Sequence, residues 1–80
     1  MAALPIIAHS AHTFPIIEKA ARRAARQWFA GTTSLTLYSW REDRCAYHCN
    51  GRPDPASAGD AFRAEFAREL AAIIAGVHHE

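Results

Sequence analysis

Residues 35–51, LTLYSWREDRCAYHCNG, decide the predicted fold, because apolar and polar side chains alternate with a period of two on both sides of a charged centre. Such alternation is typical of half-buried β-strands. Residues 41–44 interrupt the two runs, and Asn50-Gly51 ends the second. We therefore predict a β-hairpin with a three-residue loop at residues 41–43, where Asp43 tolerates a left-handed backbone.

The length of this loop determines which residues face each other across the hairpin. A three-residue loop pairs Leu37 with Tyr47 and Leu35 with Cys49. One face then carries Leu35, Leu37, Cys45, Tyr47 and Cys49, and the opposite face carries Thr36, Tyr38, Trp40, Arg44, Ala46 and His48. A two-residue or four-residue loop would shift the pairing by one and mix the faces, so the separation of faces favours this register.

The rest of the chain predicts one strand and two helices. Residues 4–8 form a short apolar run, which Pro5 restricts to a sheet edge or to the first position of a strand. A helix is expected over residues 14–30, capped by Thr13, with Pro15 in its first turn and Gly31 after its end. Its apolar face consists of Ile17, Ala21, Ala24 and Trp28.

A second helix is expected over residues 58–77, with Ser57 as its cap and Asp60 completing a variant capping box. The apolar face of this helix is the strongest periodic signal in the chain and consists of Phe62, Phe66, Leu70, Ile73 and Val77. The predicted class is therefore α+β, with the order β-α-β-β-α. We expect a single domain over residues 1–80, in which both helices pack on one face of a small antiparallel sheet and leave the other face open.

Length and charge restrict the range of functions. Eighty residues allow one small core and exclude large catalytic architectures. A net charge of +1 with 21% charged residues argues against a disordered tail and a uniformly basic nucleic-acid binder. Neither a secretory signal nor a membrane span is apparent, so we expect a soluble cytoplasmic protein. On one strand, Cys45 and Cys49 would lie about 13 Å apart and stay reduced.

Two surfaces are candidate partner-binding sites. The first is a basic stripe on the helix over residues 14–30, formed by Lys19, Arg22, Arg23 and Arg26. That helix carries a net charge of +3, and residues 53–80 carry −3. The second is the open sheet face with Tyr38, Trp40, Arg44 and His48, which would suit a protein interface. A solvated helix face, burial of Trp40 within the subunit, and a homodimer remain alternatives.

Metal binding and catalysis have weaker support in the sequence. Cys45 and Cys49 on one strand cannot both reach a zinc ion, and His48 would face away from them. His78-His79 is more simply explained as a frayed helix end. His48 beside Arg44 and Asp43 resembles the acid/base group of an RNA-cleaving toxin, but no catalytic motif accompanies it. We therefore expect no cofactor, no metal and no enzymatic activity, with an RNA-binding or RNA-cleaving module as the alternative.

A β-α-β-β-α chain of this size, rich in Ala and Arg, resembles the small phage-encoded inhibitors that include anti-CRISPR proteins against type I effector complexes. The resemblance concerns size and element order. It implies a cytoplasmic, non-enzymatic and often dimeric protein that docks on a larger protein or nucleoprotein complex. Such a protein blocks target DNA binding or nuclease recruitment, and direct binding of nucleic acid is the less favoured expectation.

Overall fold

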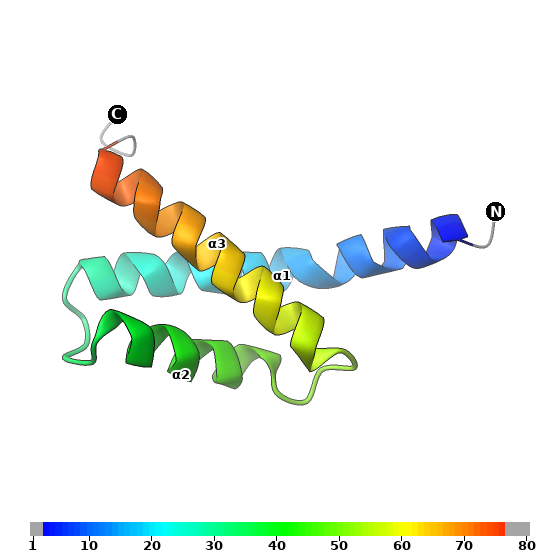
Figure 1. Cartoon of the computed structure of the whole chain (residues 1–80), viewed down its shortest axis with the longest axis horizontal. Coiled ribbons are helices and arrows are strands. Elements are labelled where there is room, and N and C mark those ends of the chain that lie inside the picture. The colour runs from blue at the N-terminus through cyan, green and yellow to red at the C-terminus, as the bar shows by residue number, and fades with distance from the viewer. Residues whose placement is uncertain (1–2, 77–80) are drawn as a thin grey trace.

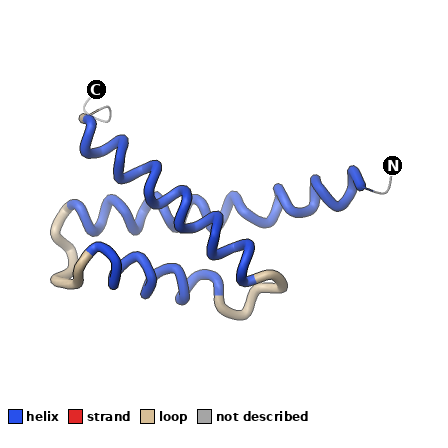
Figure 2. Tube along the Cα trace, viewed as in Figure 1, coloured by secondary structure: helices blue, strands red, loops and turns tan. Residues whose placement is uncertain are grey.

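The chain folds into three α-helices, and no strand occurs among the described residues (Figure 2). The structure is a computed structural model that describes the backbone of residues 3–76 and the side chains of residues 14–76. The helices are α1 (Ala3–Phe29), α2 (Leu37–Cys49) and α3 (Pro55–Ala75). The predicted α+β class and the order β-α-β-β-α are therefore wrong, because the fold is all-α.

The helices form two layers. Helices α1 and α2 run antiparallel side by side, and α3 starts near the end of α2 and crosses α1 on one face (Figure 1). The N-terminal part of α1 extends beyond the other two helices (Figure 1). The Cα positions span 45 × 29 × 14 Å, so the molecule is flattened. Because α3 covers only one face, the opposite side of the α1–α2 pair faces solvent.

The predicted hairpin is replaced by α2. Thr36 is the N-cap of this helix, and its hydroxyl accepts a 3.2 Å hydrogen bond from the backbone N–H of Ser39. The helical period places Leu37, Trp40, Cys45 and Cys49 against the core, whereas strand alternation would put Trp40 on the face opposite the other three. The charged residues 41–44, of which 41–43 were predicted as the loop, lie in the middle of α2 and form ion pairs. Tertiary packing and these pairs therefore outweigh the β-propensity of the segment.

The predicted strand at residues 4–8 lies within α1, and Thr13, the predicted cap, is an interior residue of that helix. Pro15 is likewise inside α1. A proline removes one backbone N–H and often ends a helix, but here the helix continues through it.

The predicted C-terminal end of this helix is confirmed. Gly31 has φ +80°, and the N–H groups of Gly31 and Thr32 donate to the carbonyls of Trp28 and Gln27 in a Schellman motif.

Helix α3 begins three residues earlier than predicted. Its N-cap is Asp54, whose carboxylate accepts a 3.2 Å hydrogen bond from the N–H of Ser57, and Pro55 occupies the first turn. Ser57 is therefore not the cap. The predicted apolar face is correct where described: Phe62, Phe66 and Ile73 are buried, and Leu70 packs against the core cluster that contains the two phenylalanines. Val77 lies outside the described residues.

The core lies where the three helices meet. Its two large aromatic side chains are Phe62 and Phe66 of α3, whose ring centroids are 6.2 Å apart. Small residues on the facing surfaces let the backbones approach closely. The fully buried cluster consists of Ile17, Ala21, Ala24, Ala25, Cys45, Cys49, Ala58, Phe62 and Phe66. No helix within the described part of the chain is long and apolar enough to cross a lipid bilayer.

Candidate functional site: a basic groove between α1 and α2

The predicted basic stripe divides into two pairs of residues with different surroundings. Arg22 and Arg26 face α3, where Arg22 Nη1 lies 3.0 Å from Glu65 Oε2 and Arg26 Nε lies 2.9 Å from Glu69 Oε2. Glu65 is buried and also pairs with Arg68. The positive helix and the negative segment identified in the sequence thus pair with each other inside the molecule. Their charges contribute to α1–α3 packing.

Lys19 and Arg23 lie on a different side of α1, and both are exposed. They line an open groove of about 270 Å³ between α1 and α2, together with Ile16, Ala20 and His48. No carboxylate among residues 14–76 forms an ion pair with Lys19 or Arg23. We call this depression the α1–α2 groove. It brings together three of the eight predicted partner-binding residues.

His48 connects the groove to the core. Its ring stacks at a centroid distance of 6.0 Å on Phe62 of α3 and contacts the Tyr47 ring edge-on at 5.0 Å. Burial lowers the pKa of His48 below its ordinary value of 6.5, and the positive charges of Arg44, Arg52 and Arg23 lower it further. The imidazole is therefore mainly neutral at pH 7, in a strongly positive environment.

Arg52, which follows α2, was not among the predicted site residues. Its Nε donates a 3.0 Å hydrogen bond to the carbonyl of His48, one of the last carbonyls of the helix. Like Lys19 and Arg23, it has no carboxylate partner among the described residues. Six of the nine cations do have one: Arg22, Arg26, Arg41, Arg44, Arg63 and Arg68. The three without a partner all lie around His48, and this clustering depends on the pairing of α1 with α2.

The other residues of the predicted open sheet face are dispersed over α2, because that sheet does not exist. Trp40 is half-buried, and its Nε1 donates a 2.9 Å hydrogen bond to the carbonyl of Ala24 in α1. Arg44 lies over Trp40 and Tyr47, at 5.2 and 4.6 Å from the ring centroids, and pairs with Asp43. Trp40 therefore holds α2 on α1, and Arg44 extends the positive surface beside His48.

Tyr38 lies near the start of α2, outside the groove lining. Its side chain is 65% exposed, and Arg41 lies over its ring at 5.1 Å. Tyr47, which the hairpin register placed in the core, is 70% exposed and borders His48. Ile16 at the groove is 66% exposed. Tyr47 and Ile16 add apolar area beside the cations, and this combination is common in protein interfaces.

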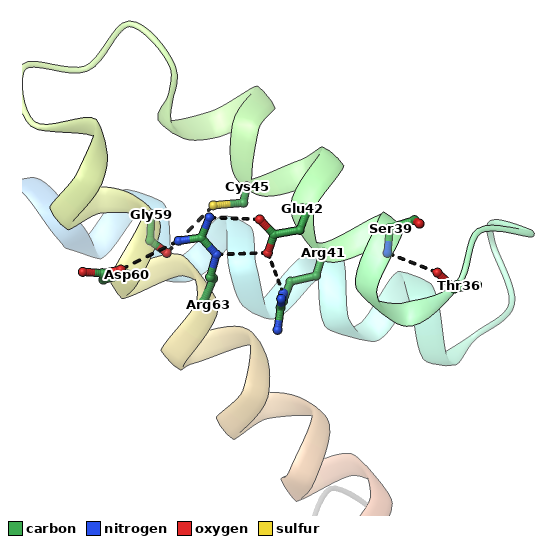
Figure 3. A network of polar contacts seen from close by, with 8 residues as sticks. All are labelled: Thr36, Ser39, Arg41, Glu42, Cys45, Gly59, Asp60 and Arg63. Atoms are coloured by element: carbon green, nitrogen blue, oxygen red, sulfur yellow. Dashed lines mark hydrogen bonds and ion pairs between the residues drawn. The ribbon is translucent and has the colours of Figure 1, made fainter.

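A polar network on the other side of α2 holds it to α3 (Figure 3). Arg63 of α3 makes two hydrogen bonds to Glu42, of 3.0 and 2.9 Å, and Arg41 makes a third contact of 2.8 Å. The hydrogen bond from Arg63 lowers the pKa of Glu42 from 4.5 to about 2, with Arg41 contributing in the same direction. We assign this network a structural role, since its charges satisfy one another.

The two cysteines are buried and free. They lie one turn apart on α2, so the separation expected for a strand is wrong. Burial raises the pKa of Cys49 to about 11, and the neighbouring Cys45 raises it as well. The described residues contain no group of three His, Cys, Asp or Glu side chains placed to hold a metal ion. His78 and His79 lie outside the described residues.

No protein-family model, curated protein or solved structure shows a significant match to the chain.

Proposed function

We propose that this chain is a non-enzymatic binding protein that docks on a larger protein or nucleoprotein complex through the α1–α2 groove and inhibits it by occlusion. The observation that carries the proposal is the clustering of Lys19, Arg23 and Arg52 around His48 without carboxylate partners in the described part of the chain. Unpaired cations beside exposed apolar side chains suit an acidic partner surface. The proposed compartment is the cytoplasm, where the free thiols of Cys45 and Cys49 would stay reduced.

The expected resemblance to small phage-encoded inhibitors included the element order β-α-β-β-α, which this chain does not have. The geometry of the groove therefore supports the docking function, and the resemblance does not. Arg22 and Arg26 are also left out of the docking surface, because their guanidinium groups pair with Glu65 and Glu69.

The test compares two variants that each lose two positive charges. Lys19→Gln/Arg23→Gln removes the groove cations. Arg41→Gln/Arg68→Gln is the matched control, in which Glu42 keeps Arg63 and Glu65 keeps Arg22 as partners. Each chain is immobilised and exposed to bacterial lysate before and after nuclease digestion, and the captured partner is then purified and titrated against all three chains.

We expect the purified partner to bind the wild type and the control equally and the groove variant at least tenfold more weakly. Equal binding of all three chains would exclude the groove as the docking surface. Loss of the captured material on nuclease digestion would instead favour the RNA-binding alternative and contradict a protein partner.

A further inference from the structure

We propose that the group bound in the α1–α2 groove is a phosphate monoester dianion, carried by a phosphorylated side chain of the partner protein. This inference rests on the proposed function and specifies the chemistry that the groove recognises. It follows from the charge, the donors and the extent of the groove.

The charge of the groove favours a dianion. Lys19 and Arg23 contribute two full positive charges from α1, and Arg52 adds a third close to His48. A carboxylate or a phosphodiester carries one negative charge, whereas a phosphate monoester carries nearly two at pH 7. With no carboxylate from residues 14–76 in the groove, the monoester neutralises more of this potential than either alternative.

The donors also match a tetrahedral oxyanion. Lys19 and Arg23 are one helical turn apart on the same side of α1, and His48 approaches the groove from α2. Arginine offers a planar fork of N–H donors and lysine a compact ammonium group, which together serve several oxygens at once. A phosphate monoester presents three terminal oxygens to donors from two helices, whereas a carboxylate presents two. Clusters of this kind are the usual means of recognising phosphorylated segments.

The limited extent of the groove argues against a nucleic-acid strand. Proteins that bind a nucleic-acid backbone neutralise several successive phosphates with lysine and arginine side chains, about six to ten in strongly salt-dependent complexes. Here six of the nine cations are held in ion pairs within the chain. Of the three without a carboxylate partner among residues 14–76, Lys19 and Arg23 line one depression of about 270 Å³, and Arg52 lies close to His48 at that depression. The exposed side chain of Ile16 at this depression offers an apolar contact for residues next to the phosphorylated one.

His48 provides a direct readout of binding. Charged and titratable groups face it from α1 (Lys19 and Arg23), from α2 (Arg44 and Tyr47) and from the following loop (Arg52), while α3 contributes the apolar Phe62. In the free protein these cations disfavour a charged imidazole. A bound dianion offsets their repulsion, so the pKa of His48 is expected to rise on binding.

The experiment is an NMR titration of the full chain at constant ionic strength and pH 7.5, with O-phosphoserine, dimethyl phosphate and acetate as probes. We expect O-phosphoserine to shift the resonances of Lys19, Arg23 and His48 in a saturable manner and to raise the pKa of His48. Dimethyl phosphate and acetate should bind at least tenfold more weakly. Lys19→Gln/Arg23→Gln should weaken phosphoserine binding at least tenfold, and Arg41→Gln/Arg68→Gln less than twofold.

Several results would overturn the inference. Equal binding of phosphoserine, dimethyl phosphate and acetate would show general attraction of anions, as would equal losses in the two double variants. Tighter binding of a 5′-phosphorylated oligonucleotide than of a phosphoserine peptide would point to nucleic acid instead. If the purified partner keeps its affinity after phosphatase treatment and still requires Lys19 and Arg23, the inference fails while the proposed function stands. If the purified partner binds Lys19→Gln/Arg23→Gln as tightly as the wild type, the proposed function fails, whatever the result of the phosphoserine titration.

Discussion

Replacing Arg22 with alanine tests the division of the basic stripe into structural and binding residues. Arg22 pairs at 3.0 Å with Glu65, whose side chain is only 10% exposed, while Arg22 itself is 35% exposed. Removing one partner of a fully buried pair costs about 3–5 kcal/mol. Glu65 keeps its contact with Arg68, and the site of Arg22 is open to water. We therefore expect a loss of about 1–2 kcal/mol in the free energy of unfolding.

A domain of this size loses about 4–8 °C in melting temperature for each kcal/mol, so Arg22→Ala should melt about 5–15 °C below the wild type. The matched control is Arg23→Ala, which removes the same side chain at the next position of α1. Arg23 has no carboxylate partner among residues 14–76, so its removal should change stability by less than about 0.5 kcal/mol. The stability changes of the two variants are measured by thermal and urea unfolding, monitored by circular dichroism. Equal melting temperatures for the two variants would refute the division.

Three further predictions concern the helix contacts. The ion pair between Glu42 and Arg63 should add about 1 kcal/mol to the free energy of unfolding, since Arg63 is 43% exposed and water screens the pair. Because the pKa of Glu42 is lowered in the folded chain, this stabilisation should be complete above pH 4.5 and disappear as the pH falls through about 2. Unfolding of wild type and Glu42→Gln between pH 2 and 6 checks this, and a pH-independent difference would contradict it. Phe66→Ala should cost about 3–5 kcal/mol, because Phe66 is 1% exposed in the core, and melting within a few degrees of the wild type would disprove this. Trp40→Phe removes the hydrogen bond to the Ala24 carbonyl and should cost about 1 kcal/mol in urea unfolding, whereas unchanged stability would show that this bond contributes nothing.

The predictable part of the fold comes from segments in which apolar spacing and end signals agree. In α3, large apolar residues recur at three and four positions, which no strand pattern imitates, and Phe62 and Phe66 are indeed in the core. The helix end at Gly31 is confirmed for a similar reason, because a glycine after an amphipathic run readily adopts positive φ. The caps are harder to place. Asp54 and Ser57 are both good N-cap residues, and Pro55 favours the earlier one.

The prediction for residues 35–51 is wrong because the pattern of this segment fits both the period of a strand and the period of a helix. Alternation of apolar and polar residues predicts strands, but Trp40 and Arg44, like Cys45 and Cys49, are also spaced by four, which fits a helix. Local β-propensity cannot decide between the two, because the outcome depends on contacts that only the folded chain supplies. Here Trp40 reaches the Ala24 carbonyl, and Glu42 reaches Arg63. Thr36 followed by Ser39 was the local signal for a cap.

The same limit applies to the candidate site. The residues of the basic stripe were evident from composition, but their division between two surfaces depends on where α2 and α3 lie. Arg22 and Arg23 are about 100° apart around α1, so one reaches Glu65 and the other the groove with His48. Arg52 and Ile16 were missed because neither belongs to a charged run or an aromatic face.

The division changes how a test of binding must be designed. Arg22 and Arg26 are spaced by four, as are Glu65 and Glu69, so the two helices meet through a matched pair of ion pairs. Charge reversal at these arginines would place like charges together at the α1–α3 interface and lower stability. A loss of binding would then not separate a missing contact from an unfolded chain. Lys19 and Arg23 carry the same charge without that structural role, so removing them tests recognition alone.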